Sequence, residues 1–286
     1  MQVISIDTVA ERARLIAFAD RFTEALAARE PQQLPVAPDV RVTENCQAIA
    51  LGTGIWRTCR GVRPGGHHFV DVERGQVAWW GVVEEIRGTG LLGVRLAVEG
   101  RLITEVEIVV GRGGEYFVPD AVLAESPEMH AILAVEDRVS RGELAAVAHS
   151  YFDAINRVSG EGLPVSPDTV RLVNGFADSA VEESGLGDKQ TYLALDVAEQ
   201  ITQGHYSYIE RIRDERFTVI DEERGLCHCA VMFDHPGDVT RPDGTQPFGA
   251  PNTMIFFEVF KVTRAGIRQV WAIGASLPYG AKDGWS

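Results

Sequence analysis

Apolar residues recur at helical spacing in two stretches of the chain that lie 129 residues apart. The first stretch contains Leu15, Phe18, Ala19, Phe22 and Leu26, and the second contains Leu144, Val147, Ala148, Tyr151 and Ile155. Each begins after a sequence typical of a capping box, Thr8-x-x-Glu11 and Ser140-x-x-Glu143. Each stretch therefore predicts an amphipathic helix with one buried face.

The two stretches stay alike further along the chain. The matching pairs are Leu34–Val36 with Leu163–Val165, Arg41 with Arg171 after one inserted residue, Glu73–Gly75 with Glu223–Gly225, and Val98 with Val262. The offset between partners only grows, as expected for a duplicated domain with insertions between its elements. We expect copy one to span residues 1–125 and copy two residues 136–286. The linker falls in the acidic, weakly periodic segment 119–141.

Strand-like segments follow each predicted helix. They are Arg41–Asn45, Gln76–Glu85, Leu91–Val98 and Ile103–Val110 in copy one, and Tyr206–Ile220, Leu226–His235, Met254–Val262 and Ile267–Ala275 in copy two. This order predicts an α+β fold in which each copy is a helix followed by an antiparallel meander. The proline-rich segment 237–252 is either a functional lid or a plain surface loop.

Composition narrows the range of partners. The 286 residues include 41 Asp and Glu against 27 Lys and Arg, a formal charge of −14, and no basic stripe, so a nucleic-acid partner is disfavoured. No apolar run reaches the ~20 residues that span a bilayer, and the N-terminus lacks the features of a signal peptide. We expect a soluble cytoplasmic protein without a membrane partner.

The sequence shows no recognisable cofactor or metal motif. Four cysteines are too few for a disulfide scaffold, and Cys227-x-Cys229 has no second ligand pair at zinc-site spacing. No glycine-rich phosphate loop or nucleophile elbow is convincing. We expect neither a metal nor a cofactor.

Three motifs carry a resemblance to a known superfamily. They are the helix ending Arg-Phe-x-x-Ala-Leu-x-Ala-Arg-Glu at 21–30, the strand Pro-Asp-Val-Arg-Val-Thr-Glu-Asn at 38–45, and the hairpin Val-x-x-x-Gly-Ile-x-x-Val at 262–270. In this order they resemble the SnoaL-like, nuclear transport factor 2-like superfamily, here written in tandem. The resemblance implies two cystatin-like cones, each a curved sheet wrapped on N-terminal helices around an apolar cavity. The superfamily includes isomerases, dehydratases, cyclases and lyases as well as non-catalytic binding modules.

The resemblance also assigns acid–base positions. Chemistry of this kind without a cofactor needs a base and donors to a developing oxyanion. The base position of ketosteroid isomerase falls on Glu44 in copy one and Asn174 in copy two. The helix tyrosine falls on Phe22 and Tyr151, and the acid of the penultimate strand on Val94 and Glu258. Copy one thus holds a base and copy two a donor pair.

Strand alternation adds further candidates in copy two. One face of Leu226–His235 carries His228, Met232 and Asp234, and Tyr206 and Tyr208 on the preceding predicted strand are expected near His228. We expect an acid–base cluster of His228, Tyr151 and Glu258, with Glu44 or His228 as base. The substrate-binding candidates are Tyr208, Met232, Phe257, Trp271, Asp234 and, in copy one, Trp79.

Each candidate also has a structural interpretation. Glu44 fits a strand-end acid, Tyr151 a core aromatic, Glu258 an ion-paired acid and His228 a satisfied sheet histidine.

The leading function is therefore a cofactor-independent isomerase, dehydratase, or carbon–carbon or carbon–oxygen lyase. Its substrate would be a small hydrophobic molecule, aromatic or polycyclic in type. The alternative is a non-catalytic small-molecule-binding or scaffolding protein. In either case we expect the two copies to pack sheet to sheet as an internal pseudo-dimer, and a homodimer of such chains is a further expectation.

Overall fold

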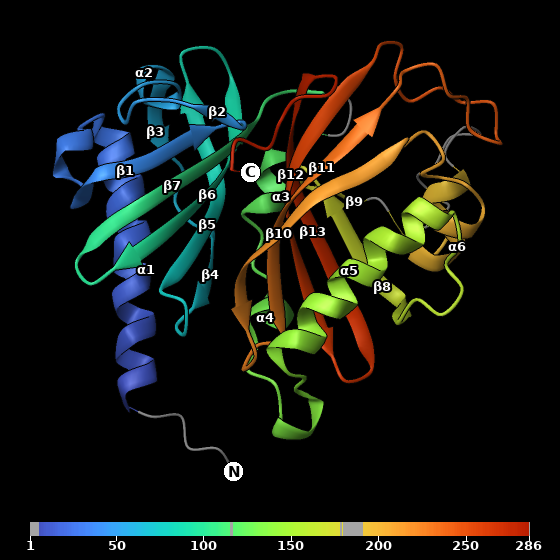
Figure 1. Ribbon diagram of the computed structural model, residues 1–286, viewed down its shortest axis with the longest axis horizontal. Helices are drawn as coiled ribbons and strands as arrows, with labels where there is room; N and C mark the ends of the chain where they lie inside the picture. The colour runs from blue at the N-terminus through green and yellow to red at the C-terminus, as the bar shows by residue number, and fades with distance from the viewer. Residues whose placement is uncertain (1–5, 115–116, 178, 180–190, 286) are drawn as a thin grey trace.

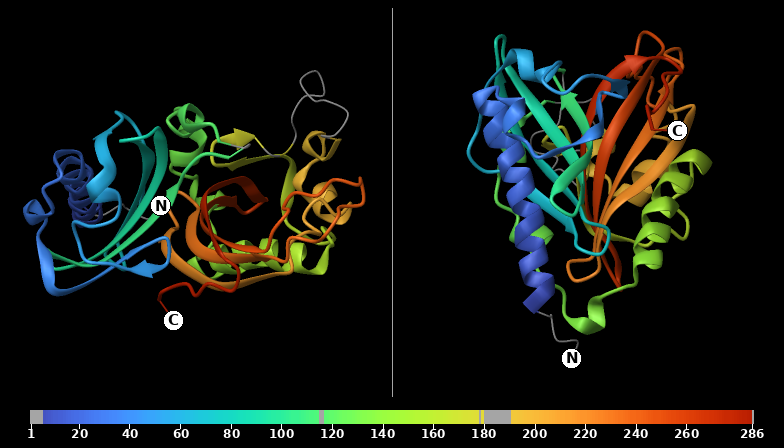
Figure 2. Two further views of the ribbon diagram at one scale, coloured as in Figure 1. Left: turned by 90° about the horizontal axis from the view of Figure 1, so that it is seen from above. Right: turned by 60° about the vertical axis from the view of Figure 1, so that its left-hand side comes forward.

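Two curved sheets lie back to back, each with helices on its outer side (Figures 1 and 2). This is the computed structural model of the chain, and it describes residues 6–114, 117–177, 179 and 191–285. The α+β class and the division into two curved sheets with helices are confirmed.

The first sheet is packed against a long N-terminal helix. Its elements are α1 (Ile6–Ala28), η1 (Pro31–Gln33), β1 (Val36–Glu44), β2 (Gln47–Ala48), α2 (Ile55–Thr58), β3 (Cys59–Val62), β4 (His67–Asp71), β5 (Gln76–Glu85), β6 (Thr89–Glu99) and β7 (Leu102–Gly111). The strand order is β2-β1-β7-β6-β5-β3, and β4 also pairs with β5.

The second sheet repeats this order. Its elements are α5 (Arg141–Arg157), β8 (Val165–Val173), β9 (Phe176–Ala177), η4 (Thr191–Ala194), α6 (Val197–Thr202), β10 (Arg211–Asp221), β11 (Leu226–His235), β12 (Asn252–Thr263) and β13 (Gly266–Pro278). Read as β9-β8-β13-β12-β11-β10, its strands correspond one by one to the first sheet, with β10 in the place of β3 and β4. The connection contains α3 (Pro119–Val122), α4 (Pro127–His130) and η2 (Val135–Asp137).

Two details of the predicted meander are wrong. Strand β1 runs parallel to β7, and β8 runs parallel to β13, so both sheets are mixed. The first strand of each copy must cross over to reach the last, which a hairpin meander cannot do. The predicted strand Tyr206–Ile220 begins only at Arg211, because Tyr206 and Tyr208 lie in tight turns after α6.

We expected one inserted residue that pairs Arg41 with Arg171. The strand register of the two sheets shows that no residue is inserted there. Asn45 and Asn174 have φ angles of 45° and 49°, and their Oδ1 atoms accept hydrogen bonds from Val110 and Gly274 backbone N–H groups. They are therefore equivalent, and the offset stays at 129. Asn174 does not correspond to Glu44.

Three apolar cores fill the molecule, because the central strands of both sheets are covered on both faces. The first core lies between α1 and the first sheet, and the second core between α5 and the second sheet. The intersheet core joins the two sheets and includes Trp80, Met232 and Phe257. Helix α1 buries Leu15, Ala19, Phe22 and Leu26, and α5 buries the predicted equivalents Leu144, Ala148, Tyr151 and Ile155. Both predicted helices are confirmed.

Two ion pairs cross the intersheet core in opposite directions. Arg141 at the start of α5 binds Asp71 of the first sheet at 2.7 Å, and Arg12 in α1 binds Asp221 of the second at 2.8 Å. The arginines are 129 residues apart, and each aspartate precedes a Glu-Arg-Gly turn. This exchange of equivalent contacts is what a two-fold interface produces.

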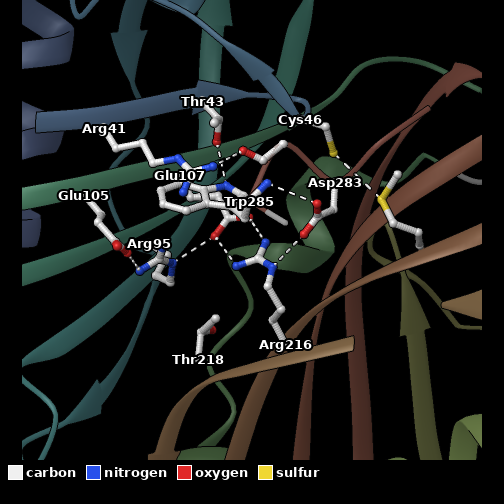
Figure 3. Close-up of polar contacts among 12 residues, drawn as sticks. Arg41, Thr43, Cys46, Arg95, Glu105, Glu107, Arg216, Thr218, Asp283 and Trp285 are labelled. Atoms are coloured by element: carbon white, nitrogen blue, oxygen red, sulfur yellow. Dashed lines mark hydrogen bonds and ion pairs between the residues drawn. The ribbon is translucent and has the colours of Figure 1, made fainter. Parts of the chain in front are cut away.

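The C-terminal segment also joins the sheets (Figure 3). The Trp285 indole N–H donates to Thr43 Oγ1 at 3.0 Å, and its ring lies 4.3 Å from the Arg41 guanidinium. Beside it, Glu107 accepts hydrogen bonds from Arg95 and Arg216. The segment thus fastens the end of β13 to the first sheet. None of the described helices combines the length and hydropathy needed to cross a membrane.

Asp71 provides a test of the sheet-to-sheet packing. Its buried carboxylate accepts hydrogen bonds from Arg141 and from the Ile220 backbone N–H. Asp71→Ala leaves both donors without this acceptor, so we expect the free energy of unfolding in urea to fall by about 2–3 kcal/mol. The control Asp153→Ala breaks the half-exposed pair with Arg157 and should cost no more than about 0.5 kcal/mol. Equal effects of the two substitutions would contradict this packing role.

Candidate acid–base site inside the second sheet

Glu258 is a buried acid that points into the second core. It lies on β12 between Phe256 and Phe260, which also face the second core. The side chain is fully buried, and neither carboxylate oxygen has a partner among the described residues. Burial raises the pKa of Glu258 to about 7, although the Arg171 charge opposes this rise and Glu215 adds to it. An unpaired buried carboxyl is costly to keep, which makes it a candidate for function.

Arg171 and Tyr151 interact electrostatically with this carboxyl. The Arg171 Nε donates to the Tyr151 hydroxyl at 2.8 Å, and both side chains are buried. Burial raises the pKa of Tyr151 to about 12, with the Arg171 charge opposing the rise. Burial disfavours the Arg171 charge, but Tyr151, Tyr206 and Glu258 outweigh it and raise its pKa. The tyrosine therefore stays a neutral donor, and the arginine stays a cation.

Tyr206 also packs against Arg171. Its ring centroid is 5.1 Å from the guanidinium carbon, and its hydroxyl donates to Gln200 Oε1 at 2.9 Å. Gln200 in α6 is itself fixed, because its amide donates to the Tyr192 carbonyl at 2.9 Å. The position of Arg171 thus depends on the turn between α6 and β10.

The first core has apolar side chains at the equivalent places. Phe22, Val42 and Val94 correspond to Tyr151, Arg171 and Glu258 by helix offset and strand register. Trp79 corresponds to Cys229, the neighbour of Glu258, and its indole lies over Gly81, where a Cβ would come within 2.3 Å of the ring. The first core is therefore filled with apolar side chains where the second has polar groups and a smaller neighbour.

Glu44 lies apart from these groups, at the end of β1. Its Oε2 accepts a hydrogen bond from the Ile55 N–H at 2.6 Å, at the start of α2, and Arg112 lies 3.9 Å from its Oε1. Burial raises the pKa of Glu44, while the bond to Ile55 opposes the rise. Glu44 belongs to the edge of the first core, so the structure does not bring it together with Tyr151.

The expected cluster of His228 with Tyr151 and Glu258 is wrong. Alternate residues of a strand face opposite sides, and His228 lies on the intersheet face of β11. Its Nε2 accepts from Trp80 Nε1 at 3.3 Å, so Nδ1 carries the proton and bonds Thr218 Oγ1 at 2.8 Å. Burial lowers the pKa of His228 to about 3. His228 is a satisfied neutral histidine.

Three expected substrate-binding residues share this face. Met232, Phe257 and Trp271 all belong to the intersheet core, and the Phe257 ring packs on Gly93. They therefore do not face Glu258, because they lie on the other face of the sheet.

Asp234 and Tyr208 also occupy unexpected surroundings. Asp234 accepts hydrogen bonds from Arg211, Arg213 and Thr253, and these donors outweigh its burial and lower its pKa. Tyr208 packs at the margin of the second core, with its ring stacked on His235 at 5.5 Å. Trp79 lies in the first core.

Arg171 is a candidate site residue that the sequence pattern did not single out. The constant offset of 129 between the two copies aligns Arg171 with the apolar Val42, so this change from an apolar to a charged residue is visible in the sequence. The one-residue insertion instead paired Arg171 with the exposed Arg41. In the part of the chain that the structure describes, no three His, Cys, Asp or Glu side chains gather as metal ligands, and the four cysteines are buried free thiols.

Comparisons with known proteins found one family match and several partial structural matches. Residues 137–274 match a family described as a domain of unknown function, DUF8021. No curated protein has a detectably similar sequence. Solved structures each align with about half of the chain. A candidate polyketide cyclase from Silicibacter is 13% identical, covers 48% of this chain and 92% of its own, and has a TM-score of 0.34.

Two further solved structures align with this chain over a similar share of its length. A candidate ketosteroid isomerase from Kribbella flavida is 17% identical, with 46% and 98% covered and a TM-score of 0.29. A candidate isomerase from Bacillus subtilis is 8% identical, with 48% and 90% covered and a TM-score of 0.31. Because these three TM-scores are below 0.5, the candidate site rests only on its own side-chain geometry.

The raised pKa of Glu258 predicts a pH-dependent stability. The folded protein keeps this proton up to about pH 7, whereas the unfolded chain releases it near pH 4.5. The contribution of this proton to the free energy of unfolding is therefore fully present below pH 4.5 and is lost as pH rises through 7. Compared with Glu258→Gln, the wild type should lose about 3 kcal/mol of unfolding free energy between pH 4.5 and 7.5. Urea unfolding of both proteins at the two pH values measures this, and parallel pH dependences would contradict it.

Proposed function

We propose that the second half of the chain is a cofactor-independent acid–base enzyme, an isomerase, dehydratase or lyase for a small hydrophobic molecule. One observation carries the proposal: the buried Glu258 carboxyl has no hydrogen-bond partner among the described residues and interacts electrostatically with the Arg171–Tyr151 pair, at positions that are apolar in the first core. A carboxyl that titrates near neutral pH is suited to proton transfer.

The chemistry follows from the three groups. The Glu258 carboxylate removes a proton from carbon next to a substrate carbonyl, and the C–H electron pair moves to form an enolate. The new charge on oxygen is stabilised by the Arg171 cation and the Tyr151 hydroxyl. Where the substrate has a double bond between its β and γ carbons, return of the proton from Glu258 to the γ carbon gives an isomer. Loss of a leaving group from the enolate gives elimination.

The aromatic surroundings favour an apolar substrate. Phe152, Phe233, Phe256 and Phe260 face the same core, and flat apolar molecules pack well on such rings.

We further propose that the chain is a tandem SnoaL-like protein in which the first copy has become a structural partner. The crossed ion pairs and the equal strand orders support this internal pseudo-dimer. A cytoplasmic location and a homodimer stay predictions.

Proton abstraction can be tested without the natural substrate. Small cyclic and aromatic ketones are incubated with the protein in D2O, and exchange of the α-hydrogens is followed by NMR. We expect exchange that Glu258→Gln reduces by about 10²–10⁴-fold. We expect a smaller loss with Tyr151→Phe, which removes one donor. The matched control is Glu44→Gln, because this partly buried carboxylate lies at the edge of the first core, and it should leave exchange unchanged.

The controls separate the rival functions. Loss of exchange with Glu44→Gln but not with Glu258→Gln would move the base to the first copy. Ketones that bind without any exchange would favour the alternative of a non-catalytic small-molecule-binding protein.

A further inference from the structure

The loop between β11 and β12, residues 236–251, is folded onto the turn that carries Tyr206. Within the loop, Arg241 N donates to the Thr245 carbonyl at 2.8 Å, and Gly244 N donates to the Arg241 carbonyl at 2.9 Å. Gly244 has a φ of +84°, which a glycine adopts readily. This tight turn presents the Arg241 side chain to the body of the second sheet.

Arg241 holds both sides of Tyr206. Its Nε donates to the carbonyl of His205 at 2.7 Å, and its guanidinium carbon lies 4.6 Å from the Tyr208 ring centroid. The neighbouring Pro242 packs on Gly204, where a Cβ would come within 3.0 Å of the proline ring. The loop is thus attached directly before Tyr206, at Gly204 and His205, and two residues after it, at Tyr208.

A second contact strengthens the attachment. The Phe248 ring lies 4.5 Å from the His235 ring and 5.7 Å from the Tyr208 ring. Tyr208 also packs against the second core. Opening of the loop would therefore expose the apolar margin of that core and free the turn 204–208.

We infer that Arg241 is a positioning residue for the Glu258 site: by attaching the loop to both sides of Tyr206, it holds that tyrosine against Arg171 and keeps water from the Glu258 carboxyl. The inference rests on the proposed function. It assigns a role to a residue that touches none of the proposed reacting groups and acts through Tyr206.

The groups that face Glu258 define the expected response. They are Arg171 on β8, Tyr151 on α5, Tyr206 before β10, Glu215 on β10 and Cys229 on β11, while β13 contributes the untitratable Ala272. Burial is the largest cause of the raised pKa of Glu258, larger than the opposing Arg171 charge. Entry of water should therefore lower that pKa even if Arg171 also shifts.

The test is a titration of the full chain labelled with ¹³C at the glutamate carboxyl carbons, followed by NMR. The spectrum of Glu258→Gln assigns the Glu258 signal. In Arg241→Gln the Glu258 midpoint should fall by about one unit or more. Tyr208→Leu removes the ring beneath Arg241 and should have the same effect. The control Arg268→Gln removes an arginine at the opposite end of the second sheet, paired with Asp168, and should leave the midpoint unchanged.

The outcomes distinguish the two proposals. A midpoint near 7 in the wild type that neither Arg241→Gln nor Tyr208→Leu changes would overturn the role of Arg241 and leave the proposed function standing. An equal fall in Arg268→Gln would also overturn it, because the effect would then be general loosening. A wild-type midpoint near 4.5 would instead contradict the proposed function itself.

Discussion

The central strands of both sheets are buried on both faces, and this burial decides which core each of their side chains enters. Residues on β11 and β12 alternate between the second core and the intersheet core, so one step along the chain changes the surroundings completely. Glu258 enters the second core and its neighbour Phe257 enters the intersheet core. The intersheet core is formed because each sheet is apolar on both faces and needs a partner on the side away from its helix.

The two halves have kept the same frame and changed its contents. Their strand orders agree, and the exchanged ion pairs of Arg12 and Arg141 preserve a two-fold relation between the sheets. Within that frame, the first core is filled by Trp79, Phe22 and Val94. The second core keeps a cation, a phenol and an unpaired carboxyl at low cost only if the surrounding turn and loop hold them in place. A stable apolar half thus supports a half with a costly polar interior.

Much of the fold could be predicted from the sequence, and the site only in part. The helical spacing aligned Phe22 with Tyr151, and the closing hairpins aligned Val94 with Glu258, as the strand register confirms. The alternation of β11 correctly grouped His228 with Met232. It could not tell which group faces the helix, because Cys227, Cys229 and Val231 on the other face are just as apolar and buried. Parallel pairing of β1 with β7 has no local signature either, since the two strands are far apart in the sequence.

At mildly acidic pH the burial of Glu258 keeps it a protonated carboxylic acid, without a hydrogen-bond partner among the described residues. Infrared spectroscopy tests this directly, because a carboxylic acid free of hydrogen bonds absorbs at a higher C=O stretching frequency than one that is bonded to water. We expect such a band at pH 6, its loss as pH rises through about 7, and its absence in Glu258→Gln. A spectrum at pH 6 in which wild type and Glu258→Gln show the same acid bands would contradict this expectation.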